Sequence, residues 1–411
     1  MKPAAVWTTW LELAEAADSG IRYPDAMHFL VAAPGVHGHL QPLLPFAIEL
    51  KSRGHQVTLC GPAALDAVAA ERGMPFVPVG PAEGLGFKVT EAMRAELDAM
   101  DEMQRTRQVA AYFEPYHLAV APDIVRLAGE VRPHCIIRGA SGLGAGLAGE
   151  LTGIPVASIN YLPPRPTGEA GKFRIEAINL LRQKVRLPAK PDPLDRDLIL
   201  AVGVAGWYTP DELGSSAQPV QPSDPEPGAP PPQWLDAMGR ERPLVYATLG
   251  TEFSTTAGAF EAMFAGLQTI DCDVVATVGP RGDPAKFPDL PDRIRIERYI
   301  PQAHVLTRCQ AVVCHAGFGS LNGALARGLP VVTIPMGAAG NLANARRVER
   351  LGAGIAILPD ARTGANIAGA TRRILAEMTF AQQARTVASA TAELPDVNDG
   401  ADMLERHAAN A

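Results

Sequence analysis

The segment AVVCHAGFGS, residues 311–320, decides the fold class. Four apolar residues suit a buried parallel strand, a turn with two glycines follows, and a helix is expected at 321–327. Glycines let the backbone approach a ligand closely, and the free N–H groups at a helix start favour an anion by roughly 0.3–2 kcal/mol. The order of strand, glycine turn and helix therefore predicts an anion site in an α/β domain.

The side chains of this turn suit a diphosphate. His315 is expected to donate a hydrogen bond or a positive charge, and Ser320 to cap the helix or donate to a phosphate oxygen. The alternative is an ordinary strand–helix turn with a structural histidine.

Strands and helices alternate on both sides of this turn. Strands are expected at 28–33, 56–60, 76–79, 135–138 and 156–160, and then at 244–249, 273–278, 294–296, 311–314 and 331–334. Helices are expected between them, at 40–53, 62–72, within 90–132 and at 142–152 in the first half. This alternation predicts doubly wound parallel sheets with right-handed crossovers.

The length of 411 residues exceeds what one core usually organises, so two domains are expected. A proline-rich stretch at 207–233 is expected to link them. The predicted parts are an extension at 1–26 with a short helix at 7–17, a first domain at 27–206, the linker, a second domain at 234–395, and a tail at 396–411. Whether this tail packs back on the first domain is left open. Ligands are expected between the carboxyl ends of the strands of the two domains.

Composition excludes several classes of function. The formal net charge is −7 without a basic stripe, which argues against nucleic acid as a partner. Five scattered cysteines suit reduced thiols, and the chain shows no signal-peptide pattern and no membrane span, so a cytoplasmic protein is expected. The acid-x-acid sequence at 271–273 starts a strand and is interpreted as structural, so no metal site is expected.

Several motifs flank the anion turn. Tyr299-Ile-Pro-Gln302 precedes it, and Gly328-Leu-Pro-Val-Val-Thr-Ile-Pro335 and Asn344-Ala-Arg-Arg-Val348 follow it. The stretch at about 299–356 resembles the C-terminal signature of family 1 glycosyltransferases, which glycosylate plant and bacterial natural products. The resemblance implies the GT-B fold, in which two Rossmann-like doubly wound domains face each other across a cleft.

The N-terminal half is similar to the same family. Gly38-His-Leu-Gln-Pro42 and Arg53-Gly-His-Gln-Val-Thr58 look like its opening pattern, in which a histidine after the first strand is the general base. By position, the resemblance assigns this role to His39, whereas His37 is expected to line the site or to be structural. A histidine with a pKa near 6.5 can take a proton from an acceptor hydroxyl, whose oxygen then attacks the anomeric carbon with inversion. The alternative for His39 is a helix-entry histidine bonded to backbone.

The resemblance also implies the donor contacts. The nucleotide and diphosphate contacts are expected at Gly250, Thr251, Gly279, Tyr299, Ile300, Gln302, His315, Gly317, Phe318, Gly319 and Ser320. Tyr299 stands where many relatives stack a tryptophan on the base.

Two positions depart from the family pattern. Gly139 replaces an aspartate that orients the catalytic histidine in many relatives, so another group or a water must orient His39. At the sugar site, Gly340 and Asn341 replace an acid–glutamine pair found in relatives that use glucose. Because unpaired buried sugar hydroxyls cost roughly 1–3 kcal/mol each, a deoxy or amino sugar is expected.

The resemblance implies an enzyme of the hexosyltransferase type in antibiotic or other secondary metabolism. It is expected to be inverting, to need neither metal nor cofactor, and to move a sugar from a dTDP- or UDP-sugar to a small lipophilic acceptor. The acceptor is expected near the methionine and aromatic residues of 93–116 and the segment 162–168, although core packing explains the former about as well. Two alternatives stay open: an enzyme that hydrolyses or epimerises sugar nucleotides, and a degenerate homologue that binds nucleotide or assists a partner enzyme. A homodimer is also left open.

Overall fold

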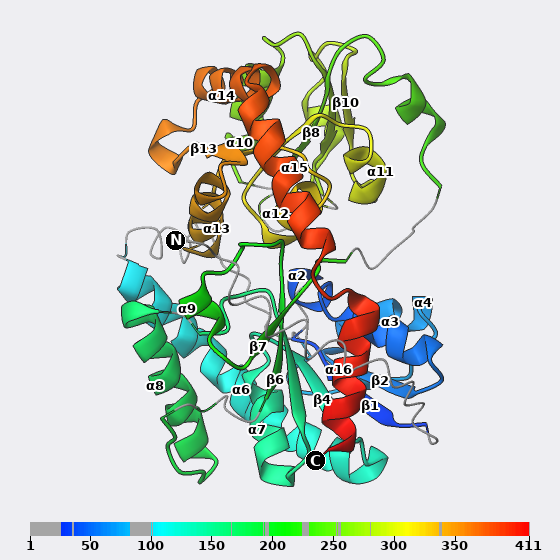
Figure 1. The fold of residues 1–411 in the computed structure, drawn as a ribbon, viewed down its shortest axis with the longest axis vertical. Coiled ribbons are helices and arrows are strands. Elements are labelled where there is room, and N and C mark those ends of the chain that lie inside the picture. Colours follow the sequence, from blue (N-terminus) through cyan, green and yellow to red (C-terminus); the bar gives the residue numbers. More distant parts are fainter. Residues whose placement is uncertain are drawn as a thin grey trace.

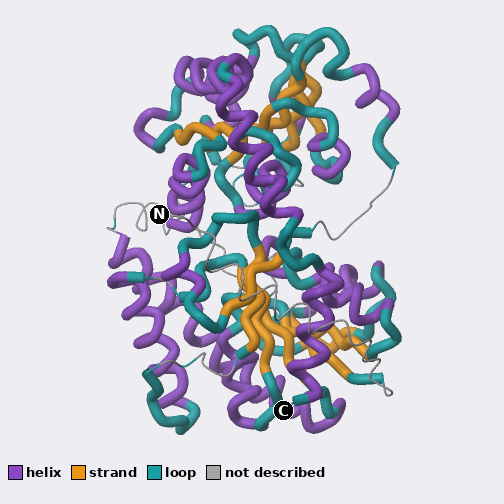
Figure 2. The backbone as a smooth tube through the Cα atoms, viewed as in Figure 1, coloured by secondary structure: helices purple, strands orange, loops and turns teal. Residues whose placement is uncertain are grey.

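The protein consists of two α/β domains, one above the other in Figure 1. The computed structural model describes residues 26–34, 37–82, 100, 102–165, 167–191, 193, 197–223, 230–251, 253, 256–279, 281–336 and 339–410. The extension at 1–25, with its predicted helix, lies outside these residues. Figure 2 shows the strands of each domain as a layer with helices packed around it.

The first domain is built on a parallel sheet of order β3-β2-β1-β4-β5-β6-β7. Its strands are β1 (His28–Ala32), β2 (Gln56–Gly61), β3 (Phe76–Pro78), β4 (Cys135–Gly139), β5 (Val156–Asn160), β6 (Leu198–Val202) and β7 (Ala217–Val220). Its helices are α2 (His37–Leu40), α3 (Leu44–Ser52), α4 (Asp66–Glu71), α6 (Glu102–Val131), α7 (Leu143–Thr152), α8 (Gly168–Lys184) and α9 (Pro210–Leu213). Strands β4 and β5 are buried along their whole length, and β1 is buried from Phe29 onward, as a helix-covered parallel sheet requires. The strand order reverses between β1 and β4, and such a switch point usually leaves a ligand crevice.

The second domain repeats this plan with the order β10-β9-β8-β11-β12-β13. Its strands are β8 (Leu244–Thr248), β9 (Asp273–Thr277), β10 (Ile294–Glu297), β11 (Ala311–Cys314), β12 (Val331–Thr333) and β13 (Gly354–Ala356). Its helices are α10 (Ala259–Leu267), α11 (Gln302–Leu306), α12 (Phe318–Leu325), α13 (Ala339–Arg350), α14 (Gly364–Ala376) and α15 (Met378–Ala392). Short 3₁₀ segments are η2 (Ala63–Leu65), η3 (Gln233–Ala237), η4 (Pro284–Lys286) and η5 (Pro359–Ala361).

The first part of the predicted linker is wrong. Within 207–233, α9 and the edge strand β7 belong to the first domain, and β7 pairs in parallel with β6. The Trp207 side chain is fully buried, and the hydroxyl of Tyr208 donates a hydrogen bond to the carbonyl of Val202 over 2.8 Å. Proline is tolerated in an edge strand, so Pro219 lies within β7 and does not mark a linker.

The last helix, α16 (Val397–Ala409), returns to the first domain and packs against α3 (Figure 1). Arg53, at the end of α3, pairs with Asp402 and Glu405. The Nε2 atom of His55 lies 2.9 Å from a carboxylate oxygen of the same Glu405. Gly400 lies so close to the Phe46 ring that an added Cβ would be 2.4 Å from it. The chain therefore crosses between the domains twice.

Among the described residues, each helix is too short or too polar to cross a lipid bilayer.

Candidate functional site

The predicted site residues gather at two sheet edges. In a parallel sheet all carboxyl ends share one edge, and the predicted donor residues follow β8, β9, β10, β11 and β12 of the second sheet. His39 follows β1 of the first sheet, where β4 and β5 also end. The order of the strands thus brings together residues that are far apart in the sequence.

The anion turn differs in one detail from the sequence prediction. Helix α12 begins at Phe318 rather than 321, with Gly317 as its N-cap residue, so Ser320 lies in the first turn and does not cap the helix. The turn passes through Ala316, whose φ of 64° is in the left-handed region. The side-chain amide of Asn344 donates a hydrogen bond to the Ala316 carbonyl over 3.0 Å. Asn344 therefore fixes the turn, and the first N–H groups of α12 have no intrahelical acceptor.

His315 is held between two glycines. A Cβ added at Gly250 would lie 2.6 Å from His315 Cε1, and one added at Gly317 would lie 2.3 Å from His315 Nε2. The Phe253 ring lies 5.6 Å from the imidazole. Burial lowers the pKa of His315 to about 4, so the ring is neutral near pH 7. Of the two predicted roles, donation of a hydrogen bond fits the neutral ring, and donation of a positive charge to a bound diphosphate stays a prediction.

The other predicted nucleotide contacts differ in their exposure and in their hydrogen bonds. Gly279, with a φ of 75°, follows β9, and the Thr251 carbonyl accepts a hydrogen bond from Arg281 over 3.0 Å. Gln302 starts α11 and points its amide at the Gly319 carbonyl, 3.4 Å away. Tyr299 is 64% exposed, which suits a base-stacking ring. Ile300 is buried in the core, so its side chain is not available and its backbone alone could contact a base.

The two sugar-site positions start α13. Gly340 is exposed, and a Cβ added there would meet no other part of the described chain within 4 Å. Asn341 is buried, and its amide nitrogen lies 3.4 Å from the Met336 carbonyl, to which it donates. Asn341 is therefore partly committed to the backbone.

His39 has a partner that the sequence did not reveal. Its Nδ1 atom shares a hydrogen bond with the hydroxyl of Ser141 over 2.8 Å. Ser141 follows by two residues the end of β4 at Gly139, the position at which the family pattern places an aspartate. The ring is partly buried, and desolvation lowers its pKa to about 4. The neutral imidazole is thus oriented through Nδ1, which leaves Nε2 for a ligand. His37 belongs to α2, and its side chain lies outside the described residues.

Aromatic rings connect His39 to the anion turn. The Tyr161 ring lies 5.2 Å from the His39 ring, and its hydroxyl lies 3.4 Å from that of Ser141. The Phe318 ring, from the start of α12, lies 5.8 Å from Tyr161 and 6.1 Å from Trp207. The two halves of the predicted site therefore meet between the domains.

The residues predicted at the acceptor site fall largely in a part of the chain whose side chains are not described. Met93 and the side chains of Met103, Tyr112 and Phe113 lie outside the described residues. Tyr116 packs in the core of the first domain, which favours the core explanation for that residue.

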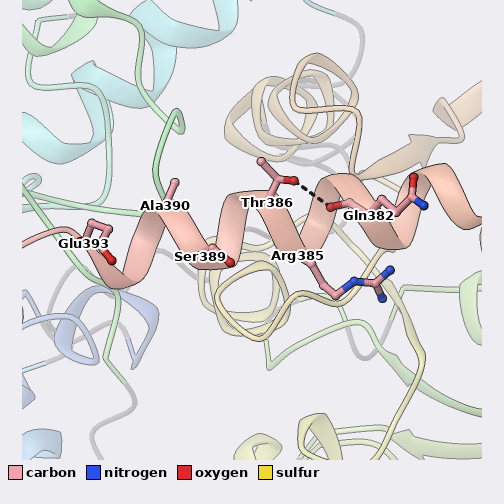
Figure 3. Close-up of a pocket in the computed structure, with 6 residues that line it drawn as sticks. All are labelled: Gln382, Arg385, Thr386, Ser389, Ala390 and Glu393. Carbon is pink, nitrogen blue, oxygen red and sulfur yellow. Dashed lines mark hydrogen bonds between the residues drawn. The ribbon is translucent and has the colours of Figure 1, made fainter. Parts of the chain in front are cut away.

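A surface hollow lies elsewhere, along the exposed face of α15 (Figure 3). It is lined by Gln382, Arg385, Thr386, Ser389, Ala390 and Glu393. These side chains include none of the predicted site residues.

The acid-x-acid sequence is engaged in structural contacts. Asp271 pairs with Arg242, and Asp273 accepts a hydrogen bond from the Gly239 amide over 2.8 Å. Within the described ranges, histidine, cysteine and acidic side chains form no cluster suited to a metal ion.

Comparisons with known proteins agree with this architecture. Residues 29–131 match the glycosyltransferase family 28 N-terminal domain, and residues 261–406 match the erythromycin biosynthesis protein CIII-like C-terminal domain. The chain is 30% identical to the elloramycin glycosyltransferase ElmGT of Streptomyces olivaceus, across 92% of this chain and 97% of that protein. It is 25% identical to the aclacinomycin-T 2-deoxy-L-fucose transferase of Streptomyces galilaeus, across 92% and 96%.

A solved structure with the same fold is the spinosyn rhamnosyltransferase SpnG complexed with thymidine diphosphate. It superposes with a TM-score of 0.76 at 24% identity, across 92% of this chain and all of that one. The two facing parallel-sheet domains are thus those of the GT-B fold.

Proposed function

Because this chain belongs to the family 1 natural-product glycosyltransferases, we propose that it transfers a sugar from a dTDP- or UDP-sugar to a hydroxyl of a small lipophilic acceptor, with His39 as the general base. The observation that carries the proposal is the line of contacts from the anion turn through Phe318 and Tyr161 to His39. A donor held at the turn and an acceptor held at the imidazole would meet between the domains.

His39 suits the role of base because its ring is neutral and oriented. With Nδ1 held by the Ser141 hydroxyl, Nε2 can take the acceptor proton as the oxygen attacks the anomeric carbon. Attack from the side opposite the leaving diphosphate inverts the configuration. A pKa of about 4 makes a weak base in the unliganded protein, but a bound diphosphate would raise it by stabilising the imidazolium.

The leaving group is a diphosphate, and the second domain offers it neutral donors. The N–H groups at the start of α12 and the imidazole of His315 supply hydrogen bonds and a favourable dipole without a metal ion. The thymidine diphosphate bound by the similarly folded rhamnosyltransferase supports thymidine as the nucleoside of the donor here.

The sugar is proposed to lack hydroxyls that glucose carries. The start of α13 offers an open glycine and a partly committed amide in place of a carboxylate. Related proteins named for 2-deoxy-L-fucose and rhamnose transfer support the same class of donor. Turnover with UDP-glucose compared with a set of dTDP-deoxysugars tests this, and a clear preference for glucose would contradict it.

Replacement of His39 by alanine tests the mechanism. General-base catalysis contributes about 10²–10⁴-fold, so kcat should fall by that factor, while thymidine diphosphate affinity measured by calorimetry stays unchanged. Unchanged turnover would remove His39 from the chemistry. A chain that binds nucleotide but transfers no sugar to any acceptor would instead support the degenerate homologue.

A further inference from the structure

Phe318 lies in the second domain and contacts both domains. Its backbone lies in the first turn of α12, where the diphosphate is expected, whereas its ring packs against the cores of both domains. The ring contacts Trp207 and Tyr161, which are buried residues of the first domain.

Tyr161 in turn contacts Ser141 and His39. Its hydroxyl lies 3.4 Å from that of Ser141, and its ring lies against His39. Ser141 is a weak orienting group, because a hydroxyl rotates freely and carries no charge, unlike the aspartate of many relatives. Packing against the Tyr161 ring, 5.2 Å away, adds a second constraint on the imidazole.

The start of α12 is fixed relative to the first domain. The side-chain oxygen of Asn322 accepts a hydrogen bond from the Val204 amide over 2.9 Å, and its nitrogen donates to the Phe318 carbonyl over 3.2 Å. The position of the Phe318 ring is therefore set by a contact between the domains as well as by its own helix.

We propose that Phe318 is a positioning residue for the base: its ring holds Tyr161 against Ser141 and thereby aligns the imidazole of His39 with the donor turn. The inference rests on the proposed role of His39. It makes the alignment of the base depend on the turn that receives the diphosphate. A displacement of about 1 Å at such a distance from the chemistry can cost about 10²-fold in rate.

Histidine NMR on the full-length protein tests this without any substrate. Selectively labelled histidine reports the tautomer and titration of His39, whose signal is identified by its loss in His39→Asn. In Phe318→Leu, the pKa of His39 should rise from about 4 towards 6.5 and the tautomer preference should weaken, because the ring gains freedom and solvent. Phe318→Trp should retain the wild-type signal. Phe287→Leu, an aromatic residue packed on Phe264 in the second domain, is the matched control and should also leave the signal unchanged.

An unchanged tautomer and titration in Phe318→Leu would overturn the inference. If that variant does not fold, Tyr161→Phe keeps the ring but removes the hydroxyl next to Ser141, and a partial change of tautomer is then expected, with no change counting against the inference.

Kinetics separate this inference from the proposed function. Phe318→Leu should lower kcat by up to about 10²-fold with little change in thymidine diphosphate affinity, and should cause no further loss in a His39→Ala background. Equal losses in both backgrounds would refute the coupling but leave His39 as the base. Full activity of His39→Ala alone would refute the base, whereas the NMR result would still decide whether Phe318 positions the ring.

Discussion

Gly317→Ala should weaken donor binding through one defined collision. The backbone at Gly317 has a φ of −68° and a ψ of 141°, which alanine adopts without strain. The added Cβ would lie 2.3 Å from Nε2 and 2.5 Å from Cε1 of His315. Since ordinary contact begins near 3.5 Å, the imidazole must move by about 1 Å. Gly250 also approaches Cε1 and Nε2 of this ring closely, so the imidazole has little free space into which it can move.

The cost follows from this geometry. Overpacking of this kind costs about 1–3 kcal/mol, equal to a fall in Tm of about 2–10 °C for a domain of this size. If His315 donates to the diphosphate, its displacement removes a hydrogen bond to a charged group, worth about 1.5–3 kcal/mol, or about 10–150-fold in affinity.

Thermal unfolding and calorimetry with thymidine diphosphate measure the two effects. Gly369→Ala, in α14 of the same domain and with no atom within 4 Å of the new Cβ, is the matched control. Adding His315→Ala to Gly317→Ala should restore stability but not affinity. Wild-type stability and affinity in Gly317→Ala would refute the description of this turn.

Three further predictions concern the base, pH and the last helix. Ser141→Ala should lower kcat by about 10–100-fold without loss of nucleotide affinity, and equal kcat would show that packing alone orients the base. Three rings have a pKa of about 4 in the folded protein against 6.5 when unfolded, namely His39, His117 and His315. Between these two pH values the unfolded chain binds more protons than the folded protein. The free energy of unfolding, measured by denaturant titration, should therefore be highest above about pH 6.5 and should fall towards pH 4 by on the order of 3 kcal/mol for each ring. A free energy of unfolding that does not change with pH would contradict the burial of these rings. Gly400→Val should loosen α16 and cost about 1–3 kcal/mol, with faster proteolysis after residue 396 as the measurement; unchanged cleavage would show that the helix tolerates the clash.

The elements that the sequence predicted best are those whose burial is indicated by a short run of neighbouring apolar residues. The apolar runs at 28–33 and 311–314 became strands within a residue of the expected ends, because a strand buried on both faces needs no partner pattern to be recognised. β7 was missed because an edge strand tolerates the proline and polar residues that also mark linkers.

The partner of His39 was missed for a different reason. Its role is defined by where the chain turns after β4, and Ser141, two residues past the strand, carries no signal that distinguishes it from any loop serine. The helix start at Phe318 was also missed, because glycine and phenylalanine are not typical of the first turn of a helix. Contacts between the domains, such as Phe318 with Tyr161, involve residues 157 positions apart and have no local pattern at all.

The return of α16 to the first domain decides where recombinant hybrids of such enzymes should be joined. A hybrid cut only once, between 221 and 243, would pair α3 from one parent with the last helix of another, and would separate Arg53 and His55 from Asp402 and Glu405. An exchange of sugar-donor specificity therefore calls for two junctions, the second near 393–396, so that residues 397–409 keep the same origin as the sheet they cover.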